Sequence, residues 1–250
     1  MLVLWGALGL VAGGVVNVLI SRLPYWGGSL AAPLHCHVCG HRLAVLDFLP
    51  LLGFARQRGR CRYCGKPISA RFPLVELSTA LLFALAYQRF GFAPQLLVAS
   101  LYLAALVLVF VIDWRHRLIL NVVTYPLILI CLVLAALTSW PPLPAAVLGA
   151  ATYGGFFAVL YVLAALIYRR DDALGMGDVK LAVVIGLMTG LPRSLVAMIA
   201  GIALGSLAAA AVLVAGRSGK SVMPYGTSLG VGAMLAILYG DLIVAWYMAP

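Results

Sequence analysis

Long apolar runs separated by short polar segments are the feature of this sequence that most limits its fold. The runs begin at Leu2, Leu74, Leu96, Leu118, Ala145, Val179, Ser194 and Tyr225. Most are long enough to cross a hydrocarbon core of about 30 Å as a helix. Because 64% of the 250 residues are hydrophobic, a soluble domain of this size could not bury them all in one core. The sequence therefore predicts an all-α polytopic membrane protein with about eight transmembrane helices.

The sixth run is the weak member of this series. Between Asp178 and Pro192 the apolar stretch is shorter than the roughly 20 residues that a straight spanning helix needs. We keep it as a crossing, in the form of a partial or tilted helix. Removing it would move Arg217 and Lys220 to the outer side and would worsen the charge balance across the membrane.

The basic residues indicate how the chain is oriented in the membrane. The net charge is +10, with 17 Lys and Arg against seven Asp and Glu, and the basic side chains lie in the gaps between apolar runs. This pattern follows the positive-inside rule and does not form the single basic face of a nucleic-acid-binding protein. The first run has Arg22 directly after it and no basic residue before it, the reverse of a cleavable signal peptide. We therefore expect a retained anchor with its N-terminus outside.

One segment does not belong in lipid. Residues 21–73 are rich in Arg, His, Gly and Pro and contain only short apolar pieces. We therefore expect a first transmembrane helix at residues 1–20, a small cytoplasmic domain at residues 21–73, and a transmembrane domain at residues 74–250.

Four of the five cysteines lie in this polar segment, as two C-x-x-C knuckles with 21 residues between them. They are Cys36, Cys39, Cys61 and Cys64. Two knuckles can supply the four thiolates of a tetrahedral structural Zn²⁺ site, and a small domain poor in apolar residues needs such a staple. Redox-active dithiols and structural disulfides are the alternatives, of which a cytoplasmic location disfavours disulfides. Cys131 lies in an apolar run and is interpreted as a small buried hydrophobe.

Two aspartates lie at the predicted ends of membrane helices. Asp113 ends the third apolar run, and Asp178 opens the sixth within Gly175-Met176-Gly177-Asp178; the topology above puts both at the cytoplasmic face. Taken singly, each could be a helix cap or a snorkelling charge. Brought together, two carboxylates can share one proton, so that one activates water while the other donates to a scissile carbonyl. Gly175 and Gly177 carry no side chains and would let a substrate backbone approach Asp178.

An ordered series of further motifs gives the chain a resemblance to a known family. The motifs are the stretches 17–24, 47–50, 58–65, 68–76 and 175–180. Together with the two knuckles and Asp113, they resemble those of the type IV prepilin peptidases, membrane aspartyl proteases of the G-x-G-D kind, along nearly the whole chain. The departures include Leu120, where Pro is common, and Pro224-Tyr225-Gly226-Thr227 in place of the usual Pro-Phe-Gly-Pro.

The resemblance implies an activity, a location and roles for several residues. It implies an aspartic endopeptidase of the bacterial cytoplasmic membrane that removes short basic leaders from prepilins or pseudopilins, for type IV pili or type II secretion. Asp113 and Asp178 would be catalytic, and Gly175, Gly177 and Lys180 would support the site. Members with the cysteine domain commonly methylate the new N-terminal residue with S-adenosylmethionine, so a methyltransferase activity is also expected. The expected partners are the precursor proteins and membrane lipid, and no nucleic acid.

Three other interpretations stay open at this stage. The chain could be a leader peptidase without methyl transfer, since the sequence has no glycine-rich nucleotide loop after a strand. It could be an ion-coupled transporter, although transport sites usually lie near the bilayer midplane and these aspartates lie at one face. It could also be an assembly scaffold, which would need neither aspartate.

Overall fold

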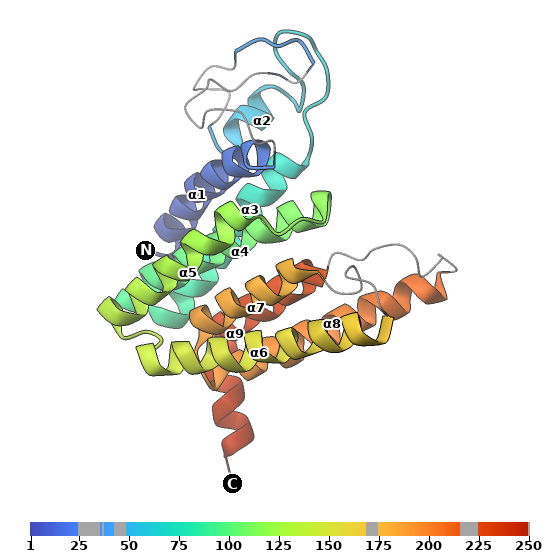
Figure 1. Ribbon diagram of the computed structural model, residues 1–250. Helices are drawn as coiled ribbons and strands as arrows, with labels where there is room; N and C mark the ends of the chain where they lie inside the picture. Colours follow the sequence, from blue (N-terminus) through green and yellow to red (C-terminus); the bar gives the residue numbers. More distant parts are fainter. Residues whose placement is uncertain (25–35, 37, 43–48, 169–174, 216–224, 250) are drawn as a thin grey trace. The chain divides into compact units, whose positions relative to one another are not determined.

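The computed structural model describes the chain apart from residues 25–35, 37, 43–48, 169–174, 216–224 and 250, and Figure 1 shows the order of its helices. The helices are α1 (Leu2–Arg22), α2 (Leu52–Arg56), α3 (Arg71–Phe90), α4 (Pro94–His116), α5 (Asn121–Thr138), α6 (Leu143–Tyr168), α7 (Met176–Thr189), α8 (Arg193–Val214) and α9 (Tyr225–Met248). Across the described ranges no strand forms, and an isolated antiparallel bridge joins Arg60 to Pro67.

The eight long helices begin within three residues of the predicted apolar runs. Six of them are long and apolar enough to cross a membrane, namely α1, α4, α5, α6, α8 and α9. In α6 and α8 only 17% of the most apolar window is buried inside the protein, so most of this apolar surface needs lipid as its solvent. The prediction of an all-α multi-pass membrane protein is thus confirmed, whereas membrane crossing by α3 and α7 stays a prediction.

The short sixth run forms α7, a helix of 14 residues. At 1.5 Å per residue it is about 21 Å long, less than a hydrocarbon core of about 30 Å. Its residues 181–189 are buried apart from the half-buried Val183, and it packs against α5, α6, α8 and α9. A helix that is apolar on every side is expected to be enclosed in this way by its neighbours.

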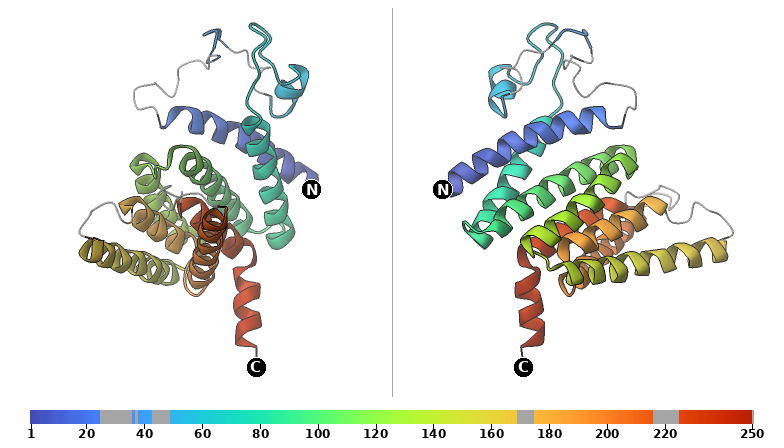
Figure 2. Two further views of the ribbon diagram at one scale, coloured as in Figure 1. Left: turned by 90° about the vertical axis from the view of Figure 1, so that its right-hand side faces the viewer. Right: turned by 60° about the vertical axis from the view of Figure 1, so that its left-hand side comes forward.

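Two compact units can be distinguished, and each is described by itself. The first comprises Met1–Leu96 with Leu103–Leu108, and the second comprises Leu97–Tyr102 with Val109–Pro250. In the first unit α1 packs along α3, as the views in Figures 1 and 2 agree. Gly9 and Gly13 permit this approach, because a Cβ atom at Gly13 would lie 2.7 Å from the Cα atom of Glu76. Small residues four positions apart let membrane helices pack closely in this manner.

A buried polar cluster joins the helices of the first unit. The Nδ2 atom of Asn17 on α1 donates to Glu76 Oε1 at 3.3 Å and to the backbone oxygen of Phe72 at 2.9 Å, both on α3. The backbone N–H of Leu51 donates to the other carboxylate oxygen of Glu76 at 2.9 Å. Asn17 and Glu76 are buried, so each needs hydrogen-bond partners within the protein. The cluster ties the segment before α2 to α3.

The second unit pairs α6 with α7 and α8 with α9. Glycines again allow the helices to touch, since a Cβ atom at Gly232 on α9 would lie 2.6 Å from the backbone nitrogen of Gly201 on α8. The last turns of α9 project beyond the other helices of this unit in both views of Figure 2, and Trp246 is exposed there. This apolar end therefore has no cover among the described residues of its own unit.

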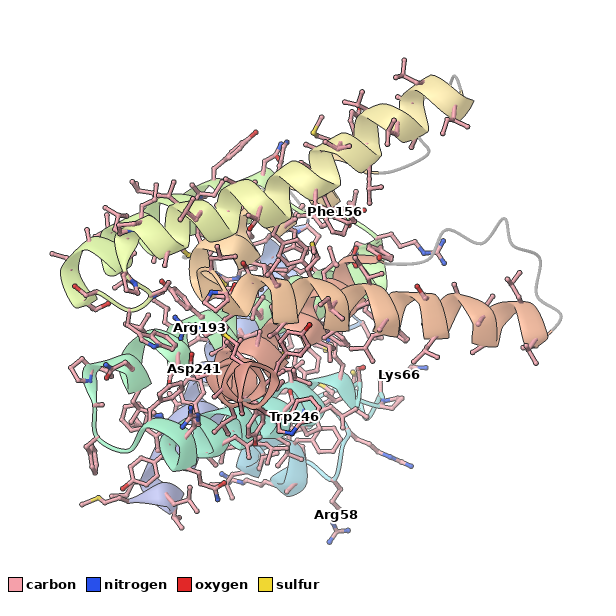
Figure 3. The ribbon with its side chains drawn as sticks, turned by 90° about the horizontal axis from the view of Figure 1, so that it is seen from below. Arg58, Lys66, Phe156, Arg193, Asp241 and Trp246 are labelled. Atoms are coloured by element: carbon pink, nitrogen blue, oxygen red, sulfur yellow. The ribbon has the colours of Figure 1, made fainter. Side chains whose placement is uncertain are left out.

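A buried arginine marks the start of α8. The side chain of Arg193 is 9% exposed and pairs with Asp241 of α9 at 3.6 Å, and Figure 3 shows the two next to each other. The guanidinium also lies 5.0 Å from the ring centre of Trp140, in the connection between α5 and α6. The ion pair and the cation–π contact together compensate the burial of this charge.

Candidate active site and cysteine cluster

Two helix ends of the second unit bring the predicted aspartates together. Asp113 lies in the last turn of α4 and is 4% exposed, whereas Asp178 lies in the first turn of α7 and is half-buried. The two side chains are close enough for the charge of Asp113 to act on Asp178. The carboxylates that the sequence singled out separately thus form a pair, contributed by different helices.

The first turn of α9 supplies a hydrogen-bond donor to this pair. The backbone N–H of Thr227 donates to Asp113 Oδ2 at 2.9 Å, in a buried position. Gly226 allows the approach, because a Cβ atom there would lie 2.8 Å from the same oxygen. Neither residue was predicted from the sequence to be part of the site. The sequence feature that could have indicated this donor is the departure from Pro-Phe-Gly-Pro, because Thr227 has a backbone N–H and proline has none.

Ile119, in the connection between α4 and α5, occupies space between two glycines of the site. A Cβ atom at Gly177 would lie 3.0 Å from Ile119 Cβ, and a Cβ atom at Gly226 would lie 3.2 Å from Ile119 Cδ1. The missing side chain of Gly177 therefore makes room for Ile119, and the support of a substrate by this glycine stays a prediction. Gly175 is exposed, and its Cβ position lies 3.4 Å from Asp178 Oδ2. Of the two predicted glycines, Gly175 is the one that leaves the Asp178 carboxylate accessible.

Lys180 lies near the pair in sequence but contacts other residues. Its Nζ atom donates to Asn121 Oδ1 at 2.9 Å and lies 5.3 Å from the ring centre of Tyr125, both in the first turns of α5. It forms no ion pair with Asp113 or Asp178. Residues two apart on a helix face different directions, which accounts for this arrangement. The lysine joins α7 to α5 and can support the site only through that connection.

Tyr225, the first residue of α9, forms an aromatic wall beside Asp178. It is close enough for the carboxylate charge to act on its phenol. Its ring centre lies 6.0 Å from that of Phe157 on α6, and a Cβ atom at Gly205 on α8 would lie 2.6 Å from the ring. Contacts with α6 and α8 thus fix the position of the Tyr225 ring.

The four cysteines of the first unit form one cluster, as the sequence predicted. Their Sγ atoms all lie within 4.8 Å of one another, and those of Cys36 and Cys64 are 3.9 Å apart. A tetrahedral Zn²⁺ with sulfur ligands at about 2.3 Å would hold its sulfurs about 3.8 Å apart. The cysteines are free in the structure. The donor set and the spacing therefore fit a metal ion such as zinc.

The two knuckles repeat one backbone pattern. The N–H of Gly40 donates to the oxygen of Cys36 at 2.9 Å, and the N–H of Gly65 donates to the oxygen of Cys61 at 2.8 Å. Both glycines have positive φ, 66° for Gly40 and 69° for Gly65, a conformation that glycine adopts without strain. The backbone N–H groups of Cys39 and Val38 lower the pKa of the Cys36 thiol to about 6. Thiolate is the form that binds metal.

Comparison with known families gives two matches that together extend over most of the chain. The bacterial peptidase A24 N-terminal domain matches residues 7–90, which include both knuckles. The type IV leader peptidase family matches residues 100–216, which include Asp113 and Asp178. No solved structure matches the chain.

Several curated proteins are similar over nearly their full length. A prepilin leader peptidase/N-methyltransferase of Bacillus subtilis (strain 168) is 33% identical over 244 residues, covering 96% of this chain and 95% of the relative. A protein of the same name from Xanthomonas campestris is 32% identical, with 96% and 92% covered. A third from Klebsiella pneumoniae is 37% identical, with 77% and 90% covered.

Proposed function

The chain belongs to the type IV leader peptidase family, and from that premise we propose that it removes the basic leader peptides of prepilins or pseudopilins and methylates the new N-terminal residue. Relatives named prepilin leader peptidase/N-methyltransferase support both activities. The transporter and scaffold alternatives are not favoured, because these similarities extend over nearly the whole chain.

The meeting of Asp113 and Asp178 is the observation that carries the peptidase half of the proposal. Two carboxylates at close range do not both ionise readily, so they hold one proton between them. The ionised member takes a proton from water as the oxygen attacks the scissile carbonyl, and the protonated member donates to the carbonyl oxygen. Peptide hydrolysis then needs no covalent intermediate. Gly175 supports this role, since it leaves room for a substrate backbone beside Asp178.

We place this site at the cytoplasmic face of the bacterial inner membrane. The bond from Thr227 to Asp113 joins the start of α9 to the end of α4, and the bond from Lys180 to Asn121 joins the starts of α7 and α5. Alternating crossings put these helix ends on one side, and the positive-inside rule assigns that side to the cytoplasm. The proposed topology has eight crossings with the N-terminus outside, and α3 and α7 are among them. Its parts are a first helix (1–20), a cysteine domain (21–73) and a peptidase domain (74–250).

A structural Zn²⁺ ion in the cysteine cluster is the second element of the proposal. Cys36, Cys39, Cys61 and Cys64 would hold it as thiolates. The ion would supply folding free energy to a domain that has little apolar core of its own. It takes no part in peptide hydrolysis, which belongs to the aspartates.

Methyl transfer is the third element, and the names of the relatives carry it. S-adenosylmethionine is the proposed donor and is a co-substrate of the reaction. A leader peptidase that lacks this activity is the remaining alternative.

One experiment tests both activities. The purified protein is incubated with a pilin-like precursor and S-adenosylmethionine, and the masses of the products are measured. We expect the loss of the leader and the gain of one methyl mass on the mature N-terminus. An intact precursor, with the enzyme folded, would contradict the peptidase proposal. A cleaved but unmethylated product would support the peptidase activity and contradict the methyltransferase activity.

A further inference from the structure

The hydrogen bonds of the two aspartates differ in a way that separates their roles. Asp113 Oδ2 accepts the backbone N–H of Thr227 at 2.9 Å. In the part of the chain that the structure describes, no donor lies within hydrogen-bond distance of the Asp178 side chain. The pair is therefore asymmetric within the described part of the chain, because only the Asp113 carboxylate has a fixed donor there.

The donor belongs to the first turn of a helix, so its hydrogen bond to Asp113 replaces no hydrogen bond within the helix. Thr227 is the third residue of α9, and the first four N–H groups of a helix have no acceptor within it. The aligned peptide dipoles also place partial positive charge at this end. Gly226 is needed for the approach, since a Cβ atom there would lie 2.8 Å from Asp113 Oδ2. A hydrogen bond to a carboxylate favours its ionised form.

We infer that the first turn of α9 sets the division of labour in the pair, with Thr227 as the positioning residue that keeps Asp113 the ionised member. Asp113 is then the base, and Asp178, which is more exposed, is the acid that meets the substrate. This assignment rests on the proposed peptidase function and adds the role of each carboxylate to it.

The assignment gives a balanced reaction. Water adds its oxygen to the scissile carbonyl carbon and gives one proton to Asp113, while Asp178 gives its proton to the carbonyl oxygen. In the second step the C–N bond breaks, and Asp113 passes its proton to the leaving nitrogen. Asp178 recovers its proton from a hydroxyl of the intermediate as the new carboxyl group forms. The enzyme ends in its starting state, and one water molecule has been consumed.

Among the described residues, the elements around the pair present few other ionisable groups. Asp178 on α7 and Tyr225 on α9 interact electrostatically with each other. Lys180 is held by Asn121 on α5, and the connection between α4 and α5 presents the apolar Ile119. Arg115 and His116 follow Asp113 on its own helix. A change at position 227 therefore acts on the ionisation of the aspartate pair.

Removing the N–H without removing the residue tests the inference. Thr227→Pro removes this N–H together with the threonine side chain, and proline is tolerated in the first turn of a helix. It is also the residue that the family pattern above has at this position. The measurement is kcat/KM for cleavage of a purified pilin precursor by the full-length protein, from acid to neutral pH. The acid limb of this profile is the pH range in which kcat/KM rises as Asp113 ionises. We expect it to move to higher pH by about one unit, because the loss of one hydrogen bond to a charged group raises the pKa of that group by about this amount. Well below the limb, the rate falls about tenfold relative to wild type.

Matched variants separate the donor from the side chain. Thr227→Val and Thr227→Ser keep the N–H, so the acid limb should stay at the wild-type pH whatever their maximal rates. Gly226→Ala pushes a methyl group against Asp113 Oδ2 and should move the limb in the same direction as Thr227→Pro. This variant also serves if the proline variant does not fold.

The outcomes distinguish the inference from the function on which it rests. A wild-type profile in both Thr227→Pro and Gly226→Ala, with cleavage lost in Asp113→Asn, would overturn the assignment and leave the peptidase intact. A limb that moves equally in Thr227→Val would also overturn it, since the hydroxyl would then be responsible. Absence of cleavage by the wild-type protein would instead remove the proposed function itself.

Discussion

Asp113→Asn and Asp113→Ala should separate the catalytic role of this side chain from its structural role. Asparagine keeps an oxygen that can accept the Thr227 N–H, which now donates to Asp113 Oδ2 at 2.9 Å. Alanine leaves that N–H buried without an acceptor, at a cost of about 1–3 kcal/mol. For a chain of this size, each kcal/mol lowers the unfolding midpoint by about 2–4 °C. Alanine should therefore lower the midpoint by about 2–12 °C, whereas asparagine should change it little.

Both substitutions should nevertheless abolish leader cleavage. An amide cannot take a proton from water, and loss of general acid–base catalysis lowers a rate by about 10²–10⁴-fold. Because the two carboxylates act as one unit, Asp178→Asn alone and the double variant should lose about as much as Asp113→Asn alone. The assays are thermal unfolding in detergent and mass measurement of the cleaved precursor. Near wild-type cleavage by Asp113→Asn would refute the dyad, and equal midpoints for asparagine and alanine would refute the role given to the N–H.

Four further predictions concern other parts of the molecule. Elemental analysis of the purified protein should find one zinc ion per chain. The double variant Cys36→Ser, Cys61→Ser should lose the metal, and its methylation activity should fall more than its cleavage activity. Disulfides within both knuckles of the reduced protein would contradict this prediction. Gly13→Val should disrupt the packing of α1 on α3, because its Cβ atom would lie 2.7 Å from a backbone atom of α3, whereas a Cβ atom at Gly14 meets only a side chain at 3.5 Å; equal thermal stability of Gly13→Val and Gly14→Ala would oppose this reasoning. Asp241→Asn should destabilise the protein by about 1 kcal/mol, because it leaves a buried guanidinium without its half-exposed partner, and an unchanged midpoint would contradict it. Cleavage should depend weakly on salt, because we expect the leader to be recognised through shape and backbone, whereas an attraction between exposed charges would be screened within about 10 Å at 0.1 M ionic strength. A collapse of cleavage between low and moderate salt would contradict this expectation.

The sequence predicted the elements well because their signals are local. Apolar run length located each long helix, and the C-x-x-C spacing located a cluster whose sulfurs do lie together. The contacts that complete the site depend on chain segments far apart in sequence. Nothing local indicates that Ile119 fills the space beside Gly177, or that Lys180 turns toward Asn121. The backbone donor of Thr227 carries no side-chain signal, so it becomes visible only when α9 is placed against α4.

We expect recognition of the leader to rely on shape and backbone more than on an acidic surface. Glu76 offers no free carboxylate to basic leader residues, because it is buried, and Asn17 and the N–H of Leu51 occupy its two oxygens. Three further acidic residues, Asp47, Asp171 and Asp172, lie outside the described residues. The membrane can position the substrate instead, because the apolar helix of the precursor stays in the bilayer while its basic leader stays in the cytoplasm. The junction between them would then meet the helix ends that carry the aspartates. Exposed Gly175, beside Asp178, leaves room there for the backbone of that junction.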